Sequence, residues 1–402
     1  MTAVALPRPT LEQPGVSLRA LAGAQLLAVA AAVGSGWEGG VPHRLVAAVA
    51  LPPLAALGLT AVLVRPALRG PVGATLALFG AAALVRPAPL HLALALGALA
   101  ASAATLVATF AGEPLPAGAV RDYVTLTKPR IMSLLLVTGV CGTFVGARGR
   151  PGTATLVAAT LGLALACGGA SALNHVLDAD IDQLMGPRTA ARPVASGRLT
   201  PARGLEFGLA LSAASFALLA ATTNVLTAVL ALAGNVFYVA VYTGYLKRRG
   251  PGNIVLGGAA GAVPPLVGYA AATGHLGWAA LWLFAIVFVW TPPHFWALAL
   301  LIRDHYAAAD VPMLPVVRGD RATARRIVGY TVALVAVTVL PFALGSFGLV
   351  YLVGAIVLGG IFLAMAIRLA RRTERRQAAL VFHYSLLYLA ALFVAAAVDA
   401  VL

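Results

Sequence analysis

Nine apolar runs, each about 20 residues long, follow one another in the C-terminal two thirds of the chain, separated by short connections. They cover about 131–147, 153–173, 204–222, 224–245, 254–273, 276–301, 327–345, 347–367 and 378–399. A helix needs about 20 apolar residues to cross a bilayer. Only 10% of the 402 residues are charged, against about 25% in soluble domains. The sequence therefore predicts an all-α polytopic membrane protein. It excludes a water-soluble enzyme, and a porin-type barrel too, because the runs do not alternate in polarity.

The basic residues are confined to every second connection. Those connections hold twenty Lys and Arg residues: Arg121, Lys128, Arg130, Arg188, Arg192, Arg198, Arg203, Lys247, Arg248, Arg249, Arg303, Arg318, Arg321, Arg325, Arg326, Arg368, Arg371, Arg372, Arg375 and Arg376. The alternate connections contain only Arg148 and Arg150. The positive-inside rule places the basic side in the cytoplasm, so we expect a multi-pass protein of the cell (inner) membrane. The net charge of +15 is then explained by basic connections beside the lipid bilayer, which is the expected partner. We expect no nucleic-acid partner.

Residues 1–117 are expected to form a separate unit. Apolar runs near 20–35, 45–64, 71–85 and 89–111 predict an extra N-terminal helical membrane region of about four spans, of unknown function. An even number of spans returns the chain to the cytoplasm before Arg121. Residues 118–402 then form the nine-span domain.

The few acidic residues gather in two connections on the basic side. They are Asp178, Asp180 and Asp182 after the second span, and Asp304, Asp310 and Asp320 after the sixth. Asn174, Asp178 and Asp182 recur at every fourth residue and share one helix face, where like charges repel. A divalent cation such as Mg²⁺, which one or two carboxylates hold together with substrate phosphates, fits this stripe. The alternative is a solvated helix end whose acids offset nearby arginines.

Basic side chains flank the acidic stripe. Arg188 and Arg192 follow in the same connection, and arginine suits bidentate contact with phosphate oxygens. Lys128 precedes the first span, and Lys247 and Arg248 follow the fourth; each alone is more typical of a positive-inside membrane anchor. Together with metal-binding carboxylates, these residues predict a site for a polyanion such as a diphosphate.

The sixth span carries an aromatic cluster around a histidine. Pro292 and Pro293 lie within the span, and proline is tolerated where a helix lines a cavity. His294, between Trp290 and Trp296, is a functional candidate because polar residues in membranes are costly, although an interhelical structural role is the alternative. Aromatic faces can also stabilise a cation, such as the allylic cation that forms when a prenyl diphosphate ionises.

The stretch NHVLDADIDQLMGPRTAARP at 174–193 resembles the first aspartate motif of UbiA-type intramembrane prenyltransferases. Its DxDID form resembles the branch of that family that farnesylates protohaem IX. Four further stretches agree with that branch, in order: YVTLTKPRI at 123–131, YTGYLKRRGPGNIVLGGAAGAVPPLVGY at 242–269, WTPPHFWAL at 290–298 and VPMLPVVRG at 311–319.

The resemblance implies a nine-helix UbiA-type bundle that transfers a farnesyl group from farnesyl diphosphate to a vinyl group of haem b, giving haem O. It implies Mg²⁺ as cofactor and hand-over of haem O to haem A synthase or terminal oxidase assembly. Metal and catalytic residues would be Asn174, Asp178, Asp182 and Asp304, with Asp310 as a further metal ligand. Diphosphate would contact Lys128, Arg188, Arg192, Lys247 and Arg248. The haem and prenyl pocket would include His175, His294, Trp290, Phe295 and Tyr306, with His175 or His294 as an axial ligand.

The second acidic motif departs from the family. Other UbiA enzymes carry a second DxxxD, whereas Asp304 and Asp310 lie six residues apart and about 240° around a helix. The remaining alternatives are prenyl transfer to a quinone precursor or a chlorophyllide, and a membrane transporter. A transporter would place its ion sites near the membrane midplane, but the acids here lie at the inner edge.

Overall fold

The computed structural model describes residues 118–402 together with Ala74, Thr75, Ala77, Leu78 and Ala98. Apart from these five residues, the predicted N-terminal region of four spans lies outside the described residues and stays a prediction. The described part of the chain is almost entirely helical and contains no strand.

Nine helices in the described range are long and apolar enough to cross a membrane, and they coincide with the nine predicted spans. Eight of them are α6 (Pro129–Gly146), α7 (Thr153–Leu177), α10 (Pro201–Thr222), α12 (Asn253–Thr273), α13 (Trp278–Leu301), α16 (Asp320–Ala343), α17 (Leu349–Arg371) and α18 (Arg375–Asp399). The ninth is composite: α11 (Val225–Val236) continues as the π-helix η2 (Phe237–Thr243) and ends in the 3-10 turn η3 (Leu246–Arg248). π-helical turns are rare and often lie at functional sites.

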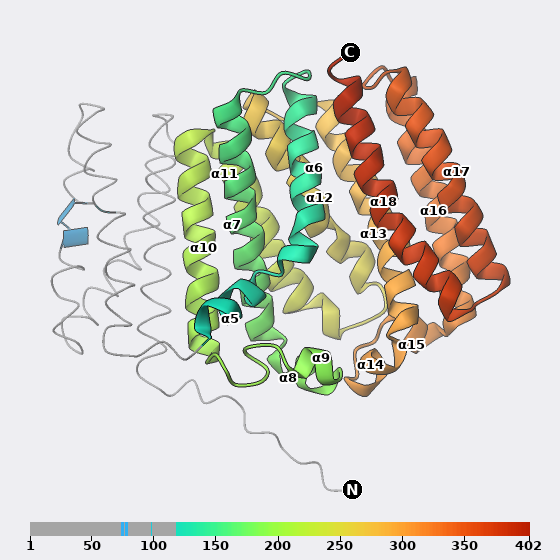
Figure 1. Ribbon diagram of the computed structural model, residues 1–402, viewed down its shortest axis with the longest axis horizontal. Coiled ribbons are helices and arrows are strands. Elements are labelled where there is room, and N and C mark those ends of the chain that lie inside the picture. The colour runs from blue at the N-terminus through green and yellow to red at the C-terminus, as the bar shows by residue number, and fades with distance from the viewer. Residues whose placement is uncertain (1–73, 76, 79–97, 99–117) are drawn as a thin grey trace, which may run out of the picture.

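Five short helices gather at the end of the bundle away from the C-terminus (Figure 1). They are α5 (Ala119–Leu126), α8 (Ala179–Leu184), α9 (Pro187–Ala190), α14 (Arg303–Ala308) and α15 (Leu314–Arg318). All five belong to basic connections, so those connections share one end of the molecule. Their cytoplasmic orientation stays a prediction.

The helices pack in two groups that meet at α6, α12 and α13. On one side α7 packs along α10 and α11, and on the other α13 contacts α16 and α18, with α17 between those two (Figure 1). Glycines let α6 and α12 approach closely. A Cβ added at Gly268 of α12 would overlap the Gly139 carbonyl oxygen of α6, a small-residue contact typical of membrane helices.

One boundary differs from the expectation. The seventh span was predicted to begin at residue 327, but α16 begins at Asp320. Arg321, Arg325 and Arg326 therefore lie on the first turns of the helix rather than in a loop. The hydropathy of the sequence marks where the apolar part of the helix begins. The helical backbone hydrogen bonds begin earlier in the chain, at Asp320.

Candidate active site

A cavity of about 440 Å³ opens between α6, α7, η2, α12 and α13, near the end that carries the short helices. Its charged lining residues come from helix ends and connections: Lys128, Asp178, Asp182, Arg192 and Lys247, with Asn174 and Thr189 beside them. Deeper in the spans its lining is mostly apolar and includes Leu135, Leu163, Val263 and Pro264. The cavity thus joins a charged mouth to an apolar interior.

The acidic stripe reaches this mouth although its helix breaks. α7 ends at Leu177, and Asp178 (φ −94°, ψ 5°) separates it from α8. Even so, the Asp178 amide donates to the Asn174 carbonyl at 2.9 Å and the Asp182 amide to the Asp178 carbonyl at 2.8 Å. The helical spacing therefore persists across the break, and Asn174, Asp178 and Asp182 all line the cavity.

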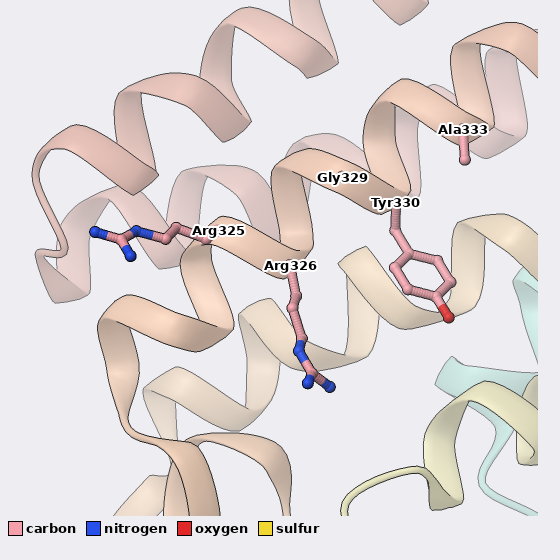
Figure 2. Close-up of a pocket in the computed structure, with 5 residues that line it drawn as sticks. All are labelled: Arg325, Arg326, Gly329, Tyr330 and Ala333. Carbon is pink, nitrogen blue, oxygen red and sulfur yellow. The ribbon is translucent and has the colours of Figure 1, made fainter.

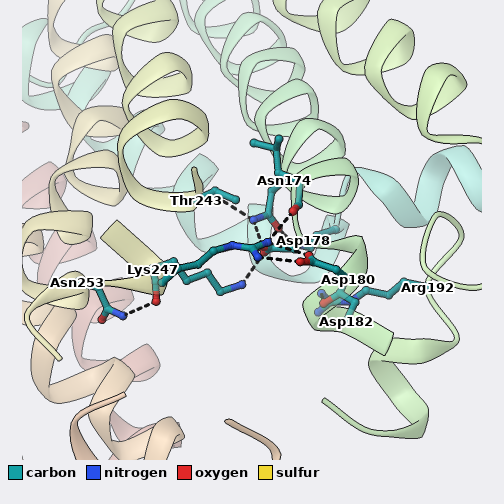
Figure 3. A network of polar contacts seen from close by, with 11 residues as sticks. Asn174, Asp178, Asp180, Asp182, Arg192, Thr243, Lys247 and Asn253 are labelled. Atoms are coloured by element: carbon teal, nitrogen blue, oxygen red, sulfur yellow. Dashed lines mark hydrogen bonds and ion pairs between the residues drawn. The ribbon is translucent and has the colours of Figure 1, made fainter. Parts of the chain in front are cut away.

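Asn174 is the centre of a buried hydrogen-bond network (Figure 3). Its Oδ1 accepts from Lys128 Nζ at 2.7 Å, and its Nδ2 donates to Asp178 Oδ2 at 2.7 Å and to Thr243 Oγ1 at 3.0 Å. The same Asp178 Oδ2 accepts from Lys247 Nζ at 2.6 Å. Three segments distant in sequence therefore hold one amide in a single orientation.

Burial perturbs the charged groups around this network. Burial raises the pKa of Asp182, and the nearby Asp178 carboxylate adds to that, while the Arg192 guanidinium, 2.6 Å from Asp182 Oδ1, opposes it. Burial also lowers the pKa of Lys128 to about 7, with Arg192 repelling the ammonium charge. Groups so perturbed in a cavity are candidates for function.

Two carboxylate oxygens at this site, Asp178 Oδ1 and Asp182 Oδ2, are buried and have no hydrogen-bond partner among the described residues. An unsatisfied buried acceptor is costly, and carboxylate oxygen is the ligand that Mg²⁺ prefers. No group of three or more His, Cys, Asp or Glu that could hold a metal occurs in the described ranges. The oxygens that could hold such an ion are those of the two carboxylates and of the Asn174 amide, whose Oδ1 accepts from Lys128 Nζ; the ion would also take substrate phosphate and water ligands.

Other basic residues of the prediction lie outside the cavity mouth. Asp180 turns outward, where both its oxygens accept from Arg248 at 2.7 and 2.8 Å. Hydrogen bonding from the Arg248 guanidinium lowers the pKa of Asp180. Arg248 and Arg188 are both exposed. Of the five residues predicted to contact diphosphate, the structure brings Lys128, Arg192 and Lys247 together.

The second acidic pair is placed apart from the first. Asp304 is exposed and lines a separate hollow of about 290 Å³ that also includes Asp320 and Glu374. Asp310 is exposed, with a left-handed backbone (φ 51°). The structure thus does not bring them to Asp178 and Asp182, and their role as metal ligands stays a prediction.

The predicted haem and prenyl residues divide between two places. Phe295 and Tyr306 line the cavity, and burial raises the pKa of Tyr306. Trp290 and His294 instead face α18, where the His294 ring stacks on Trp290 with centroids 4.3 Å apart. His175 is 2% exposed, and neither ring nitrogen has a partner in the part of the chain that the structure describes.

A hollow of similar size on α16 is unrelated to these residues. Its volume is about 430 Å³, and Arg325, Arg326, Gly329, Tyr330 and Ala333 line it (Figure 2). The two arginine side chains point in different directions (Figure 2), and all five lining residues belong to this one helix.

Two residues of the network were not anticipated from sequence. Thr243, 1% exposed, accepts from Asn174, and Asn253, 3% exposed, donates from Nδ2 to the Lys247 carbonyl at 3.1 Å. Both lie in the motif stretch 242–269. Their polar side chains beside an apolar run were the only available signal, and that signal does not reveal which partner they contact.

Comparison with known proteins identifies relatives of this chain. The model of the UbiA prenyltransferase family matches residues 135–393. A Pseudomonas fluorescens protein named protoheme IX farnesyltransferase 1 is 50% identical over 69% of this chain and 93% of its own length. A protoheme IX farnesyltransferase of Thermus thermophilus is also 50% identical over 69% of this chain. The match covers only 46% of that longer relative, so this chain corresponds to about half of it.

A solved structure has the same fold. It is a UbiA homologue from Archaeoglobus fulgidus bound to GPP and Mg²⁺, with a TM-score of 0.54 and 16% identity, covering 68% of this chain and 99% of the homologue. The resemblance drawn from the motifs is confirmed, and relatives at 50% identity carry the name of the branch that the motifs indicated. This chain is a multi-pass membrane protein, and it belongs to the UbiA prenyltransferase family.

Proposed function

We propose that the protein transfers a farnesyl group from farnesyl diphosphate to a vinyl group of protohaem IX, giving haem O. One observation carries the proposal: Asp178 and Asp182, each with a buried carboxylate oxygen that has no partner among the described side chains, line the mouth of an apolar cavity. Three basic side chains surround the same mouth. This is the arrangement that a prenyl diphosphate requires, with the charged head at the helix ends and the chain among apolar residues.

The diphosphate head would lie against Lys128, Lys247 and Arg192. Asp178, Asp182 and Asn174 would hold Mg²⁺, as supported by the solved homologue of this fold with GPP and Mg²⁺. When bound, the ion would act as a Lewis acid that offsets negative charge on the leaving diphosphate. Lys128, Lys247 and Arg192 would contact the diphosphate oxygens and stabilise the negative charge that develops as the bond breaks.

Ionisation breaks the bond between farnesyl C1 and oxygen, and the electron pair leaves with diphosphate. Aromatic faces of Tyr238, Tyr242 and Phe295 line the cavity and can stabilise the resulting allylic cation. C1 then bonds to the terminal vinyl carbon, and the positive charge passes to the carbon next to the porphyrin. Water adds there and loses a proton, which leaves a hydroxyethylfarnesyl side chain.

The location of the reaction forms part of the same proposal. The basic connections would face the cytoplasm of the cell membrane, so that farnesyl diphosphate reaches the cavity mouth from the inner side. Haem O would then pass within the bilayer to haem A synthase or to terminal oxidase assembly.

In the experiment, purified protein is incubated with farnesyl diphosphate, Mg²⁺ and one acceptor at a time. The acceptors are haem b, a quinone precursor such as 4-hydroxybenzoate, and a chlorophyllide. Mass spectrometry then identifies the products. We expect a farnesylated product with haem b alone. A product on another acceptor and none on haem would overturn the choice of acceptor, and no prenylated product from any acceptor would overturn prenyl transfer.

A further inference from the structure

The cavity that would hold the prenyl chain ends in buried side chains, opposite its charged mouth. On α7 its lining runs from Asn174 at the mouth to Leu163, and on α12 it runs from Ile254 to Pro264. The lining residue of α11 farthest from the mouth is Ala231. Leu163, Pro264 and Ala231 are all buried, so this end of the cavity is closed.

The Leu163 side chain fills the space where three helices meet. A Cβ added at Gly139 of α6 would overlap Leu163 Cδ2 and would lie 3.5 Å from the Pro264 carbonyl oxygen of α12. The tip of the leucine therefore reaches from α7 to α6 beside α12. Leu163 and Ala231 also belong to one packed cluster with Leu219 of α10. The Leu163 side chain thus separates the cavity from the core behind it.

The depth of the cavity fits one length of prenyl chain. Asn174 and Leu163 are eleven residues apart on α7, which corresponds to about 16 Å along a helix axis. The run from Ile254 to Pro264 on α12 corresponds to about 15 Å. With C–C bonds of about 1.5 Å, an extended farnesyl chain measures about 14 Å and a geranylgeranyl chain about 19 Å. The cavity therefore has room for three isoprene units but not for a fourth.

We propose that Leu163 is a specificity-determining residue, which limits the prenyl substrate to the length of farnesyl diphosphate. The inference rests on the proposed function and assigns the chain length that it uses. A fourth isoprene unit would have to displace Leu163 from a packed core, where extra volume is costly. A geranyl chain would leave the closed end of the cavity unfilled and would lose apolar contact there.

The test incubates the purified full chain in detergent with Mg²⁺, haem b and equal amounts of geranyl, farnesyl and geranylgeranyl diphosphate. Mass spectrometry gives the ratio of the prenylated haems. A second readout needs no haem: the rise in unfolding temperature with each diphosphate and Mg²⁺ measures binding to the folded protein.

Three variants alter the closed end of the cavity. Leu163→Ala enlarges it, and Leu163→Val enlarges it less with a smaller loss of packing. Ala231→Leu fills it. Leu219→Ala is the matched control, because Leu219 is a fully buried leucine of the same cluster that does not line the cavity.

We expect the wild type and Leu219→Ala to prefer farnesyl diphosphate in both readouts. Leu163→Ala should raise the ratio of geranylgeranyl to farnesyl product at least about tenfold, because one methylene in an apolar pocket already changes discrimination by about that factor. Leu163→Val should shift the ratio in the same direction and by less. Ala231→Leu should raise the ratio of geranyl to farnesyl product at least about tenfold.

Unchanged ratios in the Leu163 variants, or equal use of farnesyl and geranylgeranyl diphosphate by the wild type, would overturn the inference. The two readouts separate this failure from that of the proposed function. Binding preferences that follow the variants, without any prenylated haem, would count against the proposed function alone. Farnesylated haem with the same chain-length ratios in every variant would count against the inference alone.

Discussion

Lys247 Nζ donates a 2.6 Å hydrogen bond to Asp178 Oδ2, across 69 residues of sequence. The two side chains are 11% and 1% exposed. The bond links the end of the composite fourth span to the end of α7, at the mouth of the cavity. Because each charge is removed from water, each depends on the other for compensation.

The first prediction concerns this buried pair. Lys247→Met leaves the Asp178 carboxylate buried without its cation and should destabilise the protein by about 3 kcal/mol. Replacing both partners, in Lys247→Met with Asp178→Asn, should restore part of that loss. Thermal unfolding of purified protein in detergent measures both variants. Equal unfolding temperatures for the single and double variants would contradict the idea that the uncompensated Asp178 carboxylate causes the loss.

The second prediction concerns Thr243. Its hydroxyl accepts from Asn174 Nδ2, which also donates to Asp178, and so directs the Asn174 amide oxygen towards Lys128. Thr243→Val keeps the shape but removes the acceptor, and we expect about a tenfold loss of haem O formation, typical of removing a partner of a metal ligand. Thr243→Ser retains the hydroxyl and should recover most of the rate. A Ser variant as slow as the Val variant would contradict this role.

The third prediction concerns the contact between α6 and α12. Gly268→Ala would force a Cβ against the Gly139 carbonyl oxygen, so we expect a loss of about 1–3 kcal/mol from overpacking. Gly360→Ala on α17 is the control, because an added Cβ there meets no atom within 4 Å. Unfolding in detergent compares the two. If both variants unfold like the wild type, the close approach of the helices is not required for stability.

The fourth prediction uses the outward aspartate of the DADID segment. Asp180 is 56% exposed on its side chain and pairs with an exposed Arg248, and such surface pairs contribute at most about 1 kcal/mol. Asp180→Asn should therefore retain haem O formation within about fivefold of the wild type. A loss comparable to that of a cavity-facing aspartate would mean that the acidic segment acts as a whole.

The spans and the acidic stripe were predictable because both depend on local sequence. Twenty consecutive apolar residues can satisfy their backbone in lipid only as a helix, so all nine spans were recovered. The stripe of Asn174, Asp178 and Asp182 followed from helical spacing, and it holds even though α7 breaks at Asp178. The outward direction of Asp180 follows from the same geometry.

The partners across the site were not predictable from one sequence. The contact of Thr243 with Asn174 depends on a π-helical segment, which no hydropathy pattern indicates. The pairing of Arg248 with Asp180, and the separation of Asp304 from the cavity, depend on how the helix ends pack against one another. Charge and motif patterns identified these residue types correctly, but only the packing determines which side chains meet.

The central claim is that Asp178 and Asp182 together hold a divalent ion that drives departure of diphosphate. Its most direct test measures haem O by mass spectrometry after wild type, Asp178→Asn, Asp182→Asn and Asp180→Asn are each incubated with farnesyl diphosphate and haem b, with Mg²⁺ or with EDTA. We predict that EDTA abolishes product reversibly and that either cavity-facing variant loses at least about 100-fold, the cost of removing one preorganised electrostatic contact, while Asp180→Asn remains active. Undiminished product in EDTA, or from both cavity-facing variants, would contradict the account.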